Sequence, residues 1–231
     1  MRVLFVPGFM QRGDAWRPVA ELLPERYPSV LLDHREHTFE GRIAEIAQAG
    51  EGAVLCGYSL GGRLALRASL REPGRYAALV TVAATAGLDD PLQRSARLEA
   101  DERLAAWMEA ARIEDVVAVW ERQPLFADQS ETLIEQQRPG RLSHDPRGLA
   151  SLLRTAGQGA LEPVWHALLG FELPLLAIAG ARDERAVATA QRMADLAPGG
   201  RAAVVEDAGH AAQLQRPDAV AALLTELLDA L

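Results

Sequence analysis

The stretch Leu55-Cys56-Gly57-Tyr58-Ser59-Leu60-Gly61-Gly62-Arg63 indicates more about this chain than any other. Apolar residues lead into it from position 53, and the helix-prone run 64–68 follows it, so the stretch joins a strand to a helix. A serine between glycines at such a junction is typical of a nucleophile elbow, whose sharp turn exposes the hydroxyl above the sheet edge. The same pattern also occurs by chance in glycine-rich connections, so partner residues elsewhere have to support it.

A nucleophilic serine needs a base, and the base needs an acid that orients it. A buried-strand pattern at 173–179 runs into Asp183, and the next strand pattern, 202–206, runs into His210. Loops after the carboxyl ends of parallel strands share one edge of the sheet, so the three side chains can meet there. In isolation Asp183 fits a solvated loop acid and His210 a capping histidine. Their order after Ser59 favours a Ser-Asp-His catalytic triad.

An oxyanion hole is expected near the same edge. The first strand pattern, 2–6, runs into Pro7-Gly8-Phe9, and Gly8 permits a close approach of substrate to the backbone. We expect the N–H of Phe9 to be one oxyanion donor and the N–H of Leu60, directly after the serine, to be the other.

Composition fits one compact enzyme domain. The chain has 231 residues, of which 49% are hydrophobic, and its formal charge of −8 argues against a nucleic-acid partner. No apolar run is long enough to span a membrane, and the N-terminus enters a strand without a signal-peptide pattern. The single cysteine, Cys56, excludes an internal disulfide. We therefore expect a cytoplasmic protein with no membrane association, and its oligomeric state stays open.

Two absences limit the chemistry. All 24 basic residues are arginine, so a lysine Schiff base, a lysine phosphate loop and pyridoxal chemistry are excluded, and we expect no cofactor. The segment that contains His34, Glu36 and His37 has no standard metal-ligand spacing, so we expect no metal site either. The same arginine bias makes any single arginine weaker support for anion binding.

The order of expected elements indicates an α/β fold with a mostly parallel sheet flanked by helices. Strands are expected at 2–6, 28–32, 53–56, 78–83, 173–179 and 202–206. Helices are expected at 14–23, 40–49, 60–71, 186–196 and 217–229. Between about 87 and 160 the strand pattern gives way to helical stretches such as 92–111, 113–122 and 146–153. We interpret residues 1–231 as a single domain with a helical cap inserted at about 87–160, over the catalytic edge.

These motifs resemble the α/β-hydrolase-fold superfamily, and within it the family of 2-succinyl-6-hydroxy-2,4-cyclohexadiene-1-carboxylate synthases of menaquinone biosynthesis. The similarity spans nearly the whole chain. Its most specific pieces are Arg63 and the segments 120–126 and 141–150. The chain departs from the pattern at Pro7, where a histidine is usual, and in the loop 33–41.

The resemblance implies a lyase. Ser59, activated by His210, would remove a proton from a cyclohexene ring so that pyruvate is eliminated, while Asp183 orients the histidine. A small anionic substrate with several carboxylates would need arginines, which bind a carboxylate with two parallel hydrogen bonds. The substrate-binding residues it implies are Tyr58, Arg63, Arg97, Trp120 and Arg141.

Two other functions stay open. In a serine hydrolase of carboxylic esters or carbon–carbon bonds, Ser59 would be a true nucleophile and form an acyl-enzyme. A noncatalytic binding protein on the same scaffold would not need all three triad residues. Fold alone does not decide between lyase and hydrolase. The charge of the pocket does, since converging arginines favour a polyanionic substrate and an apolar cavity favours an ester.

Overall fold

A computed structural model describes all residues 1–231 of the chain. Its centre is a six-stranded, fully parallel sheet with the strand order β2-β1-β3-β4-β5-β6. The strands are β1 (Val3–Val6), β2 (Ser29–Leu31), β3 (Val54–Tyr58), β4 (Ala78–Val82), β5 (Leu175–Gly180) and β6 (Gly200–Val205).

Helices connect the strands and cover both faces of the sheet. The α-helices are α1 (Arg17–Ala20), α2 (Phe39–Gly50), α3 (Leu60–Arg71), α4 (Pro91–Ala110), α5 (Ile113–Glu121), α6 (Glu131–Leu142), α7 (Pro146–Ala156), α8 (Glu184–Leu196), α9 (Ala212–Gln215) and α10 (Pro217–Ala230). Three short 3-10 helices are η1 (Gly13–Trp16), η2 (Pro124–Phe126) and η3 (His166–Gly170). None of the helices is both long enough and apolar enough to cross a membrane.

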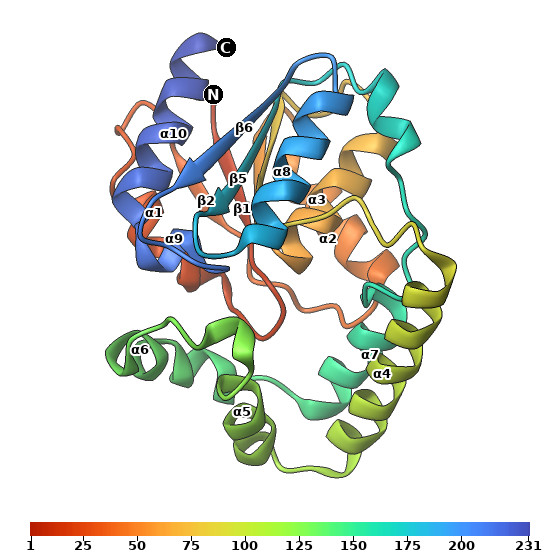
Figure 1. Ribbon diagram of the computed structural model, residues 1–231. Helices are drawn as coiled ribbons and strands as arrows, with labels where there is room; N and C mark the ends of the chain where they lie inside the picture. Colours follow the sequence, from red (N-terminus) through yellow and green to blue (C-terminus); the bar gives the residue numbers. More distant parts are fainter.

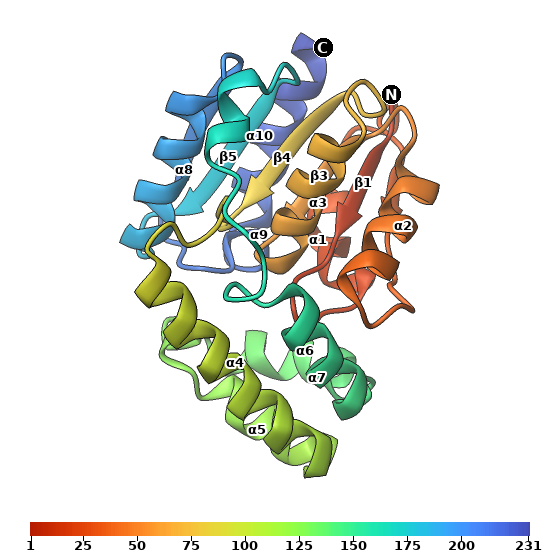
Figure 2. The same ribbon diagram turned by 90° about the vertical axis from the view of Figure 1, so that its right-hand side faces the viewer.

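The strands form the core because they are apolar on both faces. Every residue of β1, β3, β4 and β5 is buried, as expected for a parallel sheet covered by helices on both sides. Figures 1 and 2 show α1, α9 and α10 on one face and α2, α3 and α8 on the other. One hydrophobic cluster of 51 buried residues joins the sheet to these layers.

Helices α4 to α7, residues 91–156, lie beyond the carboxyl ends of the strands, and we call them the cap. They follow β4 and precede β5, two strands that pair directly in the sheet. Figure 1 shows α4 and α7 running side by side, with α5 and α6 beyond them. A second hydrophobic cluster of only eight buried residues joins α4, α5 and α7 and includes Met10 from the loop after β1, whereas α6 contributes no residue to it.

The strand positions agree with those expected from the sequence to within about two residues at each end. The expected helix at 14–23 is wrong in type and length: a 3-10 turn is followed by α1, which ends at Ala20 ahead of Pro24. Helix α6 was not expected, because it is polar and contains Pro139 in its interior. The four-residue α9 is too short for a periodic pattern.

Candidate active site

Ser59 lies on a tight turn between β3 and α3. Its backbone has φ 49° and ψ −109°, a conformation that L-residues rarely adopt, and its N–H donates to the carbonyl of Val82 at 2.8 Å. Gly61 follows closely, and a Cβ there would collide with the backbone carbonyl oxygens of Val6 and Pro7. The glycine therefore lets the start of α3 pack against the end of β1, and Ser59 is held at the strand–helix junction.

His210 and Asp183 meet Ser59 from the ends of two other strands. The Nε2 atom of His210 lies 3.2 Å from the Ser59 Oγ, and its Nδ1 atom lies 2.7 Å from Oδ2 of Asp183. With the proton on Nδ1, the imidazole donates to the carboxylate and leaves Nε2 free to accept the serine proton. Asp207, which precedes the histidine by three residues, is exposed and forms an ion pair with Arg182.

Asp183 is held by two separate contacts. It caps the N-terminus of α8, where its Oδ1 accepts the N–H of Ala186 at 2.9 Å, and this leaves Oδ2 for the histidine. Burial by itself would raise the pKa of Asp183, but the hydrogen bonds from His210 and Ala186 outweigh it and lower the pKa below its ordinary value. The acid therefore stays ionised next to the imidazole.

Two backbone N–H groups beside the serine are without partners. The N–H groups of Phe9 and Leu60 donate to no acceptor in the protein, and both residues line the same pocket as Ser59. Leu60 is the first residue of α3, so its N–H also lies at the positive end of the helix. Both groups are therefore available to an oxyanion at this edge, as the sequence predicts.

Ser59 and His210 line a cavity of about 610 Å³ that lies between the sheet edge and the cap. Seventeen of its 37 lining residues are hydrophobic, so nearly half of the wall is apolar. Five arginines and four aspartates also line it. These are Arg63, Arg97, Arg141, Arg185, Arg192, Asp89, Asp90, Asp101 and Asp183.

Arg63 differs from the other arginines of this pocket. It lies on α3, one helical turn beyond Ser59, and only 8% of it is exposed. Its guanidinium makes one hydrogen bond, to the carbonyl of Ala156 at 3.3 Å, and its Nε is buried without a partner. Burial first, and then the charges of Arg97 and Arg67, lower the pKa of Arg63 to about 9. The charge of Asp101 offsets part of this lowering, but no carboxylate forms an ion pair with Arg63.

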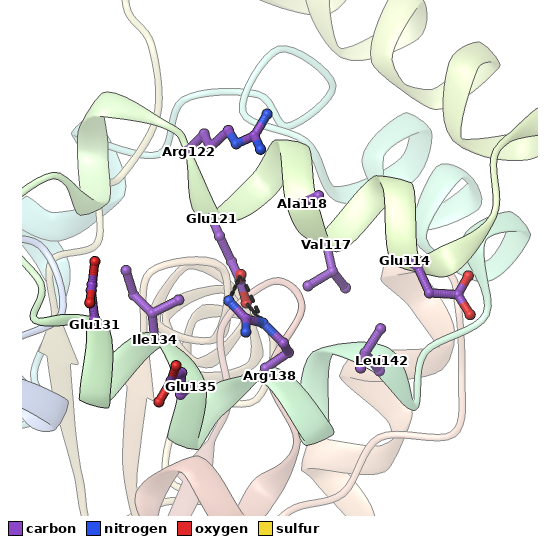
Figure 3. A pocket seen from close by; sticks show the side chains of 10 residues that line it. All are labelled: Glu114, Val117, Ala118, Glu121, Arg122, Glu131, Ile134, Glu135, Arg138 and Leu142. Carbon is purple, nitrogen blue, oxygen red and sulfur yellow. Dashed lines mark hydrogen bonds and ion pairs between the residues drawn. The ribbon is translucent and has the colours of Figure 1, made fainter.

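Arg97 and Arg141 are paired with carboxylates of the cap. Arg97 Nε donates to Asp101 Oδ1 at 2.8 Å, one helical turn along α4. Arg141 is buried, and its NH1 donates to Glu121 Oε1 at 2.9 Å. Figure 3 shows Glu121 in a groove between α5 and α6, where Arg138 also binds it. Both pocket arginines are thus held in place and partly neutralised.

The two aromatic candidates come from different parts of the fold, Tyr58 from the end of β3 and Trp120 from α5 of the cap. Tyr58 is buried and packs edge-on against the His210 ring, with ring centroids 5.5 Å apart, and burial raises the pKa of its hydroxyl. Trp120, at the end of α5, packs against Phe9 and Phe126 with centroids 5.0 and 5.6 Å apart. All ten predicted site residues therefore line this one pocket, and Asp183 also forms a hydrogen bond with His210.

The geometry can be compared with known proteins. A model of the alpha/beta hydrolase family matches residues 3–223. The chain belongs to the alpha/beta hydrolase family. The fold expected from the sequence is thereby confirmed.

Within this family, two similar relatives share the name 2-succinyl-6-hydroxy-2,4-cyclohexadiene-1-carboxylate synthase. The one from Enterobacter sp. (strain 638) is 29% identical over 98% of this chain and 91% of the relative. The one from Yersinia enterocolitica is 30% identical over 98% of this chain and 86% of the relative. The structure of MenH from S. aureus superposes with a TM-score of 0.93 at 24% identity and covers all of this chain and 94% of that one. The resemblance stated from the motifs is confirmed.

Several polar residues of this hydrolase-fold pocket were missed by the sequence reasoning. The pairing of Asp101 with Arg97 could have been predicted, because a carboxylate four residues after an arginine on a helix is a standard ion-pair spacing. Gln129, which is buried with an unpartnered Oε1, has no local signal. Arg192 stacks on the Trp165 ring at 3.8 Å and pairs with Asp89, residues far from it in the chain.

The histidines of the 33–41 loop lie away from this pocket. His34 is buried, and its Nδ1 lies 2.6 Å from Glu45 Oε2. The ring of His37 packs against Gly148 at the start of α7. No group of three or more histidine, cysteine, aspartate or glutamate side chains in the structure is arranged to hold a metal ion.

Proposed function

We propose that this protein is a carbon–oxygen lyase that eliminates pyruvate from a polycarboxylated cyclohexene, the reaction that its resemblance to the 2-succinyl-6-hydroxy-2,4-cyclohexadiene-1-carboxylate synthases implies. The observation that carries the proposal is Arg63, a buried guanidinium without a carboxylate partner in the pocket of Ser59. A buried, unpaired charge is costly, so such a residue is expected where a ligand supplies the opposite charge. A small anionic substrate fits this requirement.

In this proposal the three residues Ser59, His210 and Asp183 act as one base. His210 takes the serine proton as the serine oxygen takes a proton from ring carbon, and Asp183 stabilises the imidazolium. The C–H electron pair shifts to form a new carbon–carbon double bond. The carbon–oxygen bond to the enolpyruvyl group breaks. The departing enolate takes up, at carbon, the proton that the His210 imidazolium gives back, and becomes pyruvate. The N–H groups of Phe9 and Leu60 stabilise the negative charge that develops on oxygen.

The remaining candidates divide the work of binding. Arg97 and Arg141, each held by a carboxylate behind it, present their other N–H groups to further carboxylates of the substrate. Tyr58 and Trp120 form apolar walls on either side of the ring.

A serine hydrolase is the second candidate, and one observation favours it. Of the three predicted substrate arginines, two already have carboxylate partners, Asp101 and Glu121, so the pocket is less cationic than its arginine count suggests. In that case Ser59 attacks an ester carbonyl and forms an acyl-enzyme, with the same two N–H groups as the oxyanion hole.

The deciding experiment offers both substrates to the purified protein. We expect release of pyruvate from the synthase substrate, measured through lactate dehydrogenase and NADH, and little turnover of a short-chain p-nitrophenyl ester. The Ser59→Ala variant controls for contaminating activity in both assays. Ester turnover without pyruvate release would show that the protein is a serine hydrolase and not the proposed lyase.

The proposal includes a cytoplasmic location. Cys56 is buried in β3 and has no disulfide partner, which agrees with a reducing compartment. Fractionation of the native organism, followed by detection of the protein in the cytosolic fraction, tests this part separately.

A further inference from the structure

The cap is tied to the loop of His210 by one side chain, that of Gln215. This residue is the last of α9, five residues beyond the histidine. Its Oε1 accepts the N–H of Gly209 at 2.8 Å. Its Nε2 donates to Asp128, which lies between η2 and α6 of the cap, at 2.9 Å to Oδ2 and 3.4 Å to the backbone oxygen.

Only one orientation of the Gln215 amide satisfies this bridge. Gly209 offers a donor and therefore requires the amide oxygen, whereas Asp128 offers only acceptors and requires the amide NH₂. A glutamate at 215 would still accept from Gly209 but would place a second carboxylate against Asp128. The bridge therefore depends on an amide at this position. Replacing the amide nitrogen by oxygen would remove the hydrogen bonds to Asp128 and keep the one from Gly209.

The bridge brings the cap against the loop of His210. A Cβ on Gly209 would collide with the carboxylate of Asp128, so the two segments touch at the residue next to His210. A cleft of about 330 Å³ opens beside the contact, and Asp128, Asp183 and His210 are among the residues that line it. Asp128 itself therefore lies at the side of the imidazole and its acid, where it lines this cleft and not the main pocket.

We propose that Gln215 and Asp128 form a latch that fixes the cap over His210, and that both are positioning residues for the reaction. The role in turnover rests on the proposed function of His210 as the base; the latch itself rests on the contacts alone. Segment 124–128 carries Leu125 and Phe126, which also line the main pocket. With the latch closed, the same segment holds one wall of that pocket.

A charge rearrangement tests the latch. In Gln215→Glu the two carboxylates repel, so the latch opens while Gly209 keeps its acceptor. The double variant Gln215→Glu, Asp128→Asn exchanges the donor and the acceptor. The amide introduced at position 128 then donates to the carboxylate introduced at position 215, and the latch closes again. The matched control is Gln191→Glu on α8, where an exposed glutamine donates to Asp195 at 2.7 Å far from the site.

Two measurements follow the four proteins. Amide hydrogen exchange reports the opening of segment 124–130 without any substrate. The rate at which a fluorophosphonate labels Ser59 reports the competence of the histidine without any assumption about the natural reaction. We expect faster exchange and about tenfold slower labelling in Gln215→Glu, with both returned to near wild type in the double variant and unchanged in Gln191→Glu.

Pyruvate release then adds the catalytic consequence. We expect Gln215→Glu to lower kcat by about tenfold with a smaller change in KM, because the loop of the base moves more than the arginines do. The proposal is overturned if segment 124–130 exchanges equally fast in all four proteins, or if the double variant labels as slowly as Gln215→Glu. If the variants show the expected exchange and labelling but the wild-type protein releases no pyruvate, the proposed lyase function is wrong and the latch proposal is still supported.

Discussion

The two halves of the active site are built by different forces. Ser59, Asp183 and His210 follow strands of a parallel sheet, and a cluster of 51 buried residues fixes those strands relative to one another. Arg97 lies on α4, which contributes to a cluster of only eight buried residues, and Arg141 lies on α6, which contributes none to it. Ion pairs complete the placement of both arginines. Hydrophobic packing therefore positions the proposed triad, and charge positions the arginines of the cap.

This difference has an energetic side. Local opening is expected where few apolar contacts have to break, so the cap should open at lower free energy than the sheet. A buried ion pair such as Arg141 with Glu121 specifies a geometry more than it adds stability. Changes at the sheet edge should therefore affect the chemical step, and changes in the cap should affect the choice of substrate.

The largest expected effect comes from removal of the serine hydroxyl. Ser59→Ala should lower kcat on the order of 10³-fold or more and leave the fold intact, because the hydroxyl acts as a unit with its base. Ser69→Ala is the matched control, since Ser69 lies on the same helix, is buried, and bonds only the carbonyl of Ala65. Steady-state kinetics and circular dichroism check both. A Ser59→Ala protein with most of its activity would remove the reacting group from this account.

The acid comes next. Asp183→Asn should cost about 10²- to 10³-fold in kcat, because an amide at this position favours the wrong imidazole tautomer. Asp207→Asn is the control: it lies three residues before the histidine, but it is exposed and contacts Arg182 instead. The same kinetic assay ranks the two variants, and the opposite ranking would reverse the assignment of the acid.

Arg63 tests whether a residue on the sheet side also selects the substrate. Arg63→Ala should lower kcat/KM for the anionic substrate about tenfold to a hundredfold, and Arg63→Lys should recover only part of this. Turnover of a neutral ester should hardly change. Arg67→Ala controls for lost packing, because Arg67 is buried on the same helix and does not line the pocket. Equal handling of the anion by Arg63→Ala would remove the main support of the lyase.

The smallest effect is expected where the cap meets the sheet half. His144, between α6 and α7, is buried, and burial followed by the charges of Arg12, Arg42 and His37 lowers its pKa from 6.5 to about 3. The folded protein thus keeps this group neutral while the unfolded chain protonates it. Stability is therefore full above pH 6.5, falls as the pH drops below that value, and the loss is complete below about pH 3.

Between about pH 7.5 and about pH 5 this histidine should contribute a loss of about 2 kcal/mol in the free energy of unfolding. Urea unfolding of His144→Gln at both pH values should show a smaller loss by about that amount. His166→Gln, at an exposed histidine on η3, is the control and should keep the wild-type slope. An unchanged pH dependence in His144→Gln would show that the buried imidazole carries none of it.

Sequence reasoning succeeded where one residue type had one physical meaning. Continuous apolar runs marked the strands, and parallel strands bring their carboxyl ends together, so the meeting of Ser59 with His210 followed from order along the chain. The partners of the cap arginines were harder. Glu121 is twenty residues from Arg141, and the polar helix α6 that carries Arg141 contains a proline and lacks an apolar stripe. With 24 arginines in the chain, sequence alone did not show which ones would be left unpaired.

The insertion point of the cap has a consequence for how this molecule can change over evolutionary time. Residues 91–156 leave the sheet after β4 and return before β5, and these two strands are neighbours. The cost of closing such an excursion grows only slowly with its length, so a longer, shorter or unrelated insert can start and finish at the same two strand ends. The cap can therefore be replaced during evolution while the sheet and the residues at its edge stay the same.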